Sequence, residues 1–183
     1  MKQIIAWIVI CAGVLSFVYG AIKPYKKASA YVTAVKSGAT SVDGFVNAFK
    51  YALDYPSPVG QDELVRFISS DIMNVIAQGK NDEAVEQKLT DFIHIYADPK
   101  IERGVGMNYS QMVMMIGTMH TYKWKQYKKS EDFTLALNYF TQGYTINHDR
   151  PQFLIGLLDL YSGSGQKDKA DKIQQHITEL WGN

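Results

Sequence analysis

The sequence has little of what disulfide-rich, zinc-binding and nucleic-acid-binding proteins need. Its single cysteine, Cys11, excludes an intramolecular disulfide and a zinc site made of several cysteines. Lys and Arg number 19 and Asp and Glu number 18, so the formal net charge of +1 predicts no nucleic-acid partner. Only 5 prolines and 14 glycines occur in 183 residues, which excludes collagen-like and low-complexity chains. Hydrophobic residues make up 46% of the chain, enough for one folded domain with an appendage.

The longest uncharged run lies near the N-terminus, at residues 4–22. A helix of this length spans roughly 28 Å, close to the ~30 Å hydrocarbon core of a bilayer. Lys2 and Lys23 flank the run, and an aromatic residue lies near each of its ends. We therefore expect residues 1–23 to form a transmembrane anchor that contacts the lipid bilayer.

Two other functions of this apolar run stay open. Val18 and Gly20 are small residues that could precede a signal-peptide cleavage site before Ala21. The bulky Tyr19 between them and the length of the run both favour an uncleaved anchor, because signal peptides have an apolar core of about 7–15 residues. A pilin-like subunit would also carry an N-terminal apolar helix, and it would predict a structural homo-oligomer or filament.

Residues 24–40 are expected to form a juxtamembrane helix and linker. The expected helix restarts at Pro24 and carries Lys26 and Lys27 close to the membrane, where they would favour anionic lipid or form a solvated linker. The lysines that follow the apolar run favour a cytoplasmic C-terminal domain under the positive-inside rule, although the side of the membrane stays open.

Residues 41–183 carry apolar side chains at spacings of three and four, with no sustained alternation. This pattern predicts an all-α fold in which short turns connect antiparallel helices. Ser41 and Ser130 are expected to cap two of the helices, and Pro99 is expected to end another. The expected helices span about residues 41–55, 62–78, 82–96, 107–127, 130–145, 151–163 and 166–181.

Residues 110–183 resemble tetratricopeptide repeats, which pair two helices in a unit of 34 residues. In the last unit, the large, turn and small positions of the repeat are occupied by Leu154, Leu157, Tyr161, Gly165 and Ala170. The preceding unit matches the pattern at Val113, Ile116, Gly117, His120, Ala136, Phe140 and Gly143. Leu158 departs from it, because a small residue is expected at that position. The resemblance implies a solenoid of stacked helical hairpins, and a generic helical bundle is the alternative.

The order of elements also resembles the C-terminal tail of bacterial O-antigen ligase/polymerase-like membrane proteins, in which a last transmembrane helix precedes such repeats. The resembling stretches are residues 22–24, 45–67 and 98–104 together with the repeats. This resemblance implies a role near glycan assembly at the bacterial cell envelope. Those enzymes have many membrane spans and a catalytic loop that this sequence lacks, so no catalytic residue carries over.

No catalytic motif emerges from the remaining residues. The four histidines are His94, His120, His148 and His176, and none is spaced as in HExxH. His120 falls at a packing position of the repeat and is expected to be a satisfied core histidine. Residues 163–167 lack the spacing of a phosphate-binding loop and are expected to form a turn. We therefore predict no enzyme activity, no cofactor and no metal site.

Two surfaces are candidates for binding. Repeat geometry predicts a partner-binding groove formed by Asn108, Gln111, Met115, Met119, Tyr122, Gln152 and Asp159. A basic-aromatic patch is formed by Lys123, Trp124, Lys125, Tyr127, Lys128 and Lys129. The patch would contact anionic lipid or a partner, or it would be a solvated helix end. The methionines would be either core side chains or an adaptable binding surface.

These features predict a single-pass membrane protein whose helical domain is a non-catalytic scaffold for a protein partner at the cell envelope. One alternative is an accessory or detached tail of a system of the O-antigen ligase/polymerase type. The other is a homo-oligomer that packs through its N-terminal apolar helix.

Overall fold

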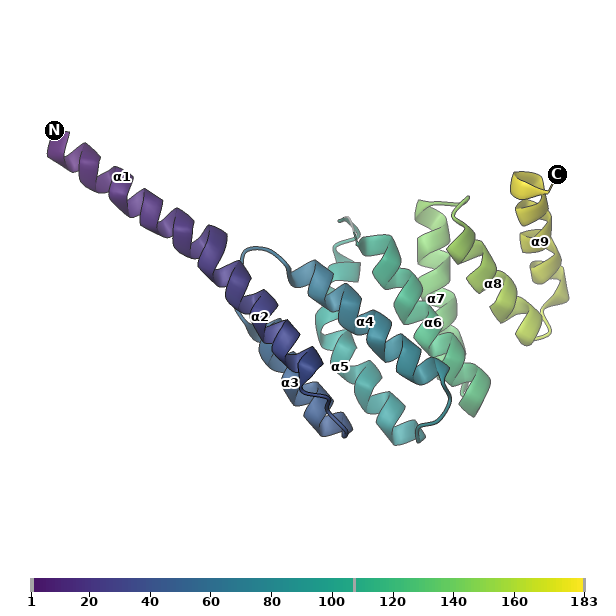
Figure 1. Cartoon of the computed structure of the whole chain (residues 1–183). Helices are drawn as coiled ribbons and strands as arrows, with labels where there is room; N and C mark the ends of the chain where they lie inside the picture. The colour runs from purple at the N-terminus through teal and green to yellow at the C-terminus, as the bar shows by residue number, and fades with distance from the viewer. Residues whose placement is uncertain (1, 107, 183) are drawn as a thin grey trace. The chain divides into compact units, whose positions relative to one another are not determined.

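The computed structural model describes residues 2–106 and 108–182, and all the regular elements within these ranges are helices (Figure 1). This confirms the all-α prediction. The chain divides into two compact units, Met1–Val65 and Arg66–Asn183, which we call unit 1 and unit 2. The expected division into an anchor, a linker and a repeat domain is a different partition and stays a prediction.

Unit 1 begins with one long helix, Lys2–Lys36, that is long and apolar enough to cross a membrane. It consists of α1 (Lys2–Phe17), a π-helical turn η1 (Val18–Ile22) and α2 (Lys23–Lys36). None of the residues in its apolar window is buried. The expected restart at Pro24 is wrong, because the helix continues through this residue. Pro24 has no N–H to donate, and the wider π turn directly before it accommodates the missing bond.

The second helix of the unit 1 hairpin is α3 (Val42–Asp54). Ser41 caps it as expected, because its hydroxyl accepts a hydrogen bond of 3.1 Å from the Gly44 N–H. Phe49 is buried between the two helices, with its ring centroid 5.9 Å from that of Tyr31 on α2. Contacts of this kind hold α2 and α3 together as a pair.

Lys27 of α2 is buried, with 2% of its surface exposed. Its ammonium donates hydrogen bonds of 3.1 Å to the Leu53 carbonyl and 2.8 Å to the Tyr55 carbonyl. Both carbonyls lie at the C-terminal end of α3, where the helix leaves acceptors unpaired and carries partial negative charge. The expectation that Lys27 faces anionic lipid is therefore wrong, since its charge is used within unit 1.

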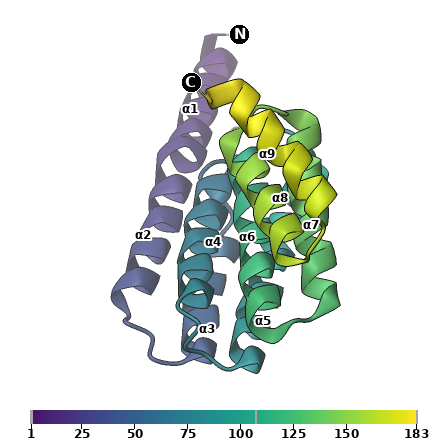
Figure 2. The same cartoon turned by 90° about the vertical axis from the view of Figure 1, so that its right-hand side faces the viewer.

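Helix α4 (Gln61–Ala77) crosses the boundary between the units. Unit 2 continues with α5 (Glu83–Glu102), α6 (Tyr109–Tyr127), α7 (Ser130–Ile146), α8 (Pro151–Gly163) and α9 (Lys167–Trp181). From α5 to α9 each helix packs on the next, and α6 also contacts α8 (Figure 2). The pairs α6–α7 and α8–α9 are therefore two successive hairpins whose first helices adjoin.

Two expected helix ends differ from the structure. Helix α5 does not end before Pro99 but continues to Glu102. The proline removes the bond to the carbonyl of Ile95, a residue 68% exposed, so water can satisfy that carbonyl. Ser130 does not cap α7 but is its first residue, and Lys129 flanks the helix without a side-chain cap.

Close packing of α7 on α8 depends on two glycines. A Cβ added at Gly143 would overlap the ring of Phe153, and a Cβ added at Gly156 would overlap the ring of Phe140. Each helix therefore supplies one ring and one glycine to the contact. Leu158, where the repeat pattern would have a small residue, is half-buried, and the close approach in α8 is instead at Gly156.

Candidate functional site

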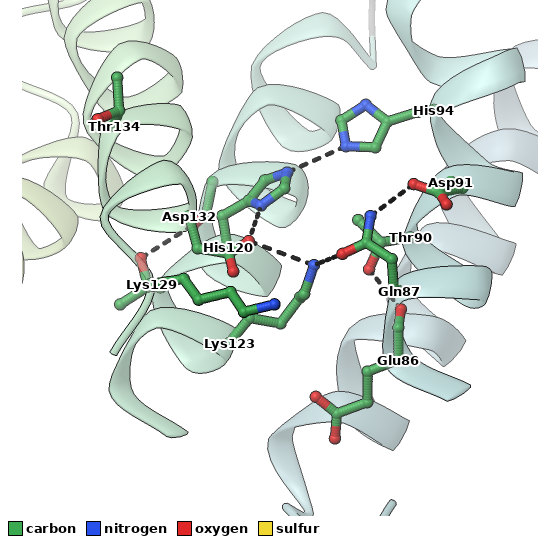
Figure 3. A network of polar contacts seen from close by, with 12 residues as sticks. Glu86, Gln87, Thr90, Asp91, His94, His120, Lys123, Lys129, Asp132 and Thr134 are labelled. Atoms are coloured by element: carbon green, nitrogen blue, oxygen red, sulfur yellow. Dashed lines mark hydrogen bonds and ion pairs between the residues drawn. The ribbon is translucent and has the colours of Figure 1, made fainter. Parts of the chain in front are cut away.

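A continuous network of polar side chains connects α5, α6 and α7, from buried residues of unit 2 to its surface (Figure 3). Helix α5 contributes four of its members and α6 contributes two. In the order of their contacts, the members are Asp98, His94, His120, Asp132, Lys123, Gln87 and Asp91.

A pair of histidines lies at the centre of the network. The Nε2 atoms of His94 and His120 are 3.0 Å apart. Each Nδ1 atom lies 2.7 Å from a carboxylate oxygen, of Asp98 for His94 and of Asp132 for His120. All four ring nitrogens are therefore in hydrogen-bonding contacts.

These contacts fix the number of protons on the pair. A carboxylate oxygen accepts, so both Nδ1 atoms must carry a hydrogen. Of the two facing Nε2 atoms, one must donate and the other must accept. Three protons on the four ring nitrogens satisfy every contact.

His120 is the ring that accepts at Nε2. Burial lowers the pKa of His120, against the opposing effect of its hydrogen bond to Asp132, so the neutral form is favoured there. The His94 side chain is 19% exposed, and its partner Asp98 reaches solvent. Tyr139 of α7 supports the pair: its ring stacks on His120 at an interplanar angle of 7°, and its hydroxyl donates to Asp98 over 3.3 Å.

Lys123 continues the network below the histidines. Only 1% of its surface is exposed, and its ammonium lies 3.2 Å from the Asp132 carboxylate and 2.6 Å from the Gln87 carbonyl oxygen. Burial would raise the pKa of Asp132, but the His120 hydrogen bond and the Lys123 charge outweigh burial and hold the pKa below its usual value. Asp132 is therefore an anion that serves both partners.

Glu86 lies next to this network but is not part of its chain of contacts. Its side chain is fully buried, and neither carboxylate oxygen has a hydrogen-bond partner among the described residues. Burial raises its pKa, and the Tyr127 hydroxyl and the Lys123 charge only partly oppose this. Burial and the charge of Glu86 together raise the pKa of Tyr127 to about 12.

The network can hold a proton and pass it between the two rings. The described residues contain no group of three or more side chains placed to hold a metal ion. His120 was expected to be a satisfied core histidine, and its contacts match that expectation. Its pairing with His94, which lies 26 residues earlier in the chain, was not predicted. The one local signal was a carboxylate, Asp98, four residues after His94 on the same helix.

A surface hollow of about 280 Å³ lies between α6 and α8, and we call it the α6–α8 groove. Its floor includes Gly156 and the Phe140 ring that packs on it. The groove is lined by Met114, Thr118, Thr121, Tyr122, Phe140, Gln152, Ile155, Gly156 and Asp159. Tyr122, Gln152 and Asp159 were expected to face a partner, so the structure brings these three together.

The other four residues expected in the groove lie elsewhere. Met119 is fully buried and Met115 is buried, so both are core side chains that cannot contact a partner. Asn108 and Gln111 are half-buried near the start of α6 and do not line the groove. Helix α6 is covered on more than one side, and it lines the groove with Met114, Thr118, Thr121 and Tyr122.

The basic-aromatic patch is divided by the structure. Lys123 belongs to the buried network and is not part of any surface. Lys125 pairs with Asp159 at 2.7 Å, and Lys129 forms an ion pair with Glu83. The remaining members contact their own neighbours: the Lys128 ammonium lies over the Trp124 ring, Trp124 packs on Phe133, and the Tyr127 hydroxyl donates to the Asn81 carbonyl.

Comparison with known proteins finds no family model that matches the chain, and no curated protein or solved structure is similar to it. The case for a function therefore depends on the groove, the network and the apolar helix. Of these, the groove is the feature that is open to a ligand.

Proposed function

We propose that this chain is a single-pass membrane protein whose helical hairpins form a non-catalytic, tetratricopeptide-like scaffold. In this proposal, α1 anchors the chain in the membrane and the α6–α8 groove binds a segment of a partner protein at the cell envelope. The lysines that follow the apolar run favour the cytoplasmic side for the helical part.

The observation that carries the proposal is the composition of the α6–α8 groove. Ile155 is 59% exposed at its edge, although it lies in a helix whose neighbouring apolar residues are buried. Around it, Tyr122, Gln152 and Thr118 offer hydrogen-bonding groups. A groove with an apolar floor and a few polar groups is suited to an extended or helical peptide that carries an aliphatic side chain.

The groove is small, so its affinity for an isolated peptide is expected to be modest. Membrane anchoring would raise the effective concentration of a partner in the same membrane. The Lys125–Asp159 pair at the groove is more than two-fifths exposed on each side, so a partner can compete for either charge without removing a buried ion.

The proposal is tested by crosslinking in intact cells. A photoreactive residue replaces Ile155 in the groove of the full-length chain, and a matched control carries it at the exposed Gln174 of α9. We expect Ile155 to capture one recurrent membrane-associated protein that Gln174 does not capture. The substitution Tyr122→Ala should reduce that capture while leaving the helical content of the chain unchanged.

Two results would contradict the proposal. Equal capture from both positions would show that the groove has no specific partner. Capture of the same chain alone would favour a homo-oligomer. Anchoring is tested separately, since an anchored chain stays with the membrane after alkaline extraction and a released chain does not.

A further inference from the structure

A second groove lies between α2 and α3 in unit 1, with a volume of about 490 Å³. We call it the α2–α3 groove. It lies outside the proposed scaffold function. Its lining residues are Tyr25, Lys26, Ser29, Ala30, Thr33, Ala34, Ser37, Ala48, Tyr51 and Tyr55.

The groove combines aromatic walls with a row of hydroxyl groups. Tyr25 and Tyr51 are largely exposed. Ser29 and Thr33 of α2 and Ser37, the residue directly after it, follow one another at intervals of four and therefore lie on one face. The hydroxyls of Thr33 and Ser37 donate to the backbone carbonyls of Ser29 and Ala34, which leaves their oxygen lone pairs free to accept.

The charge in the groove is positive. Lys26 is the one charged residue in the lining and is exposed. The neighbouring Lys27 is turned away, because its ammonium bonds to the carbonyls at the end of α3. The lining therefore offers an ammonium and hydroxyl groups to a ligand and presents no carboxylate that would repel an anion.

The position of the groove places it at a membrane surface. Helix α2 continues directly from the apolar run, and Lys23, where α2 begins, lies over the Tyr19 ring at 4.0 Å. Tyr25 and Lys26 are the next lining residues along the chain, at the depth of the headgroup layer if α1 spans the bilayer. The hydroxyl row then extends about 12 Å farther from the membrane, at ~1.5 Å per residue.

We infer that the α2–α3 groove binds the headgroup of one anionic phospholipid, with the phosphate at Lys26 and a hydroxylated headgroup at Ser29, the nearest hydroxyl of the row. This inference rests on the anchoring part of the proposed function. Phosphate is matched by the lysine ammonium and the tyrosine hydroxyls, and a polyol is matched by hydroxyl acceptors between aromatic walls.

The test counts the phospholipids that stay bound to the full-length chain. The chain is reconstituted in phosphatidylcholine nanodiscs that contain either phosphatidylglycerol or phosphatidylserine at the same mole fraction. It is then released into detergent, and native mass spectrometry measures the mass of the chain with its bound lipids. We expect one phosphatidylglycerol to be retained per chain, and about tenfold less phosphatidylserine of the same net charge.

Three variants locate the lipid. Lys26→Glu and Ala48→Trp should each lower retention about tenfold, the first by reversing the charge and the second by filling the groove. Ser29→Trp fills the groove from its exposed edge and replaces Ala48→Trp if that variant does not fold. Lys36→Glu is the matched control, because Lys36 is an exposed lysine of the same helix outside the lining.

Several outcomes would overturn the inference. The wild-type chain could be anchored and yet retain no lipid. Both groove-filling variants could retain as much lipid as the wild type, or the two anionic lipids could be retained equally. A dimer that Ser29→Trp dissociates would show that a second copy occupies the groove. A chain that leaves the membrane on alkaline extraction would instead contradict the anchoring itself, so the two failures are distinguishable.

Discussion

The two units each bury one lysine, and they neutralise it in different ways. Lys27 in unit 1 is 2% exposed and Lys123 in unit 2 is 1% exposed. The ammonium of Lys27 is satisfied by two backbone carbonyls at the end of a helix, whereas Lys123 faces the Asp132 carboxylate and the Gln87 side chain. Lys27 thus donates to backbone carbonyls at a helix end, whereas Lys123 pairs with an anion, the Asp132 carboxylate of a neighbouring helix.

The largest effect should come from removing that anion. Asp132→Asn leaves the Lys123 ammonium buried without its ion-pair partner and weakens the acceptor of His120. We expect unit 2 to lose roughly 3 kcal/mol of stability, because an uncompensated buried charge is strongly unfavourable. The loss is measured as faster amide hydrogen exchange in α6 of the full-length chain. The double variant Asp132→Asn/Lys123→Met is the control, and it should recover most of the loss.

Removing the lysine from unit 1 should have a smaller effect. Lys27→Met keeps the length of the side chain but leaves the carbonyls of Leu53 and Tyr55 without their donor. We expect a loss of about 2 kcal/mol, because two backbone carbonyls lose their hydrogen-bond donor. Amide hydrogen exchange should become faster at the end of α3 and stay unchanged in α6. A loss as large as that of Asp132→Asn would show that the two lysines are not held differently.

The two units should also respond differently to acid. Because burial lowers the pKa of His120, the folded state takes up its proton less readily than the unfolded state, whose histidine pKa is about 6.5. The contribution of His120 to stability is therefore lost as the pH falls below that value. The lowered pKa of Asp132 adds a second loss when the pH falls below about 3.8.

We expect the free energy of unfolding of unit 2 to fall by on the order of 1 kcal/mol between pH 7 and pH 5. The fall is measured as faster amide hydrogen exchange in α6, after correction for the pH dependence of the intrinsic exchange rates. The variant His120→Gln should remove this dependence, while the hairpin of α2 and α3 should show none of it. An α6 amide exchange rate that does not change with pH in the wild type would contradict the lowered pKa of His120.

The smallest expected effect is a gain in the stability of unit 2, on replacement of Glu86. Glu86 is buried with no hydrogen bond to either carboxylate oxygen, and its raised pKa means that it destabilises the folded state as the pH rises above about 4.5. Replacing it by leucine should therefore stabilise unit 2 by about 1 kcal/mol at neutral pH. Thermal unfolding of the full-length chain measures the gain, with the exposed Glu131→Leu as a control for added apolar surface. A loss in Glu86→Leu would show that this carboxylate is a needed counter-charge for Lys123.

The helices were largely predictable from the sequence, and the polar network was not. Apolar spacing located each helix because burial of one face determines that pattern. It failed at Pro24 and Pro99, where a π turn and an exposed carbonyl make a proline tolerable inside a helix. The histidine pair joins residues on different helices, and no local pattern encodes the tertiary packing that brings them together.

The burial of Lys123 could have been predicted from its helical phase, but the charge of its neighbours favoured an exposed position. It lies in a run of lysines and aromatic residues, which is typical of an exposed helix end. It also follows Ile116 by seven residues and His120 by three, and these spacings place it on the buried face of α6. Helical phase was therefore the better predictor of its environment than the charge of its neighbours.

The packing of a ring from each helix against a glycine of the other, between α7 and α8, restricts which substitutions this sequence can accept. Phe140 occupies the space above Gly156, and Phe153 occupies the space above Gly143. A methyl group gained at one glycine is tolerable only if the facing ring becomes smaller, so the two positions of each pair should change together. In related sequences, these two pairs should covary, which would allow the register of α7 on α8 to be recognised without a structure.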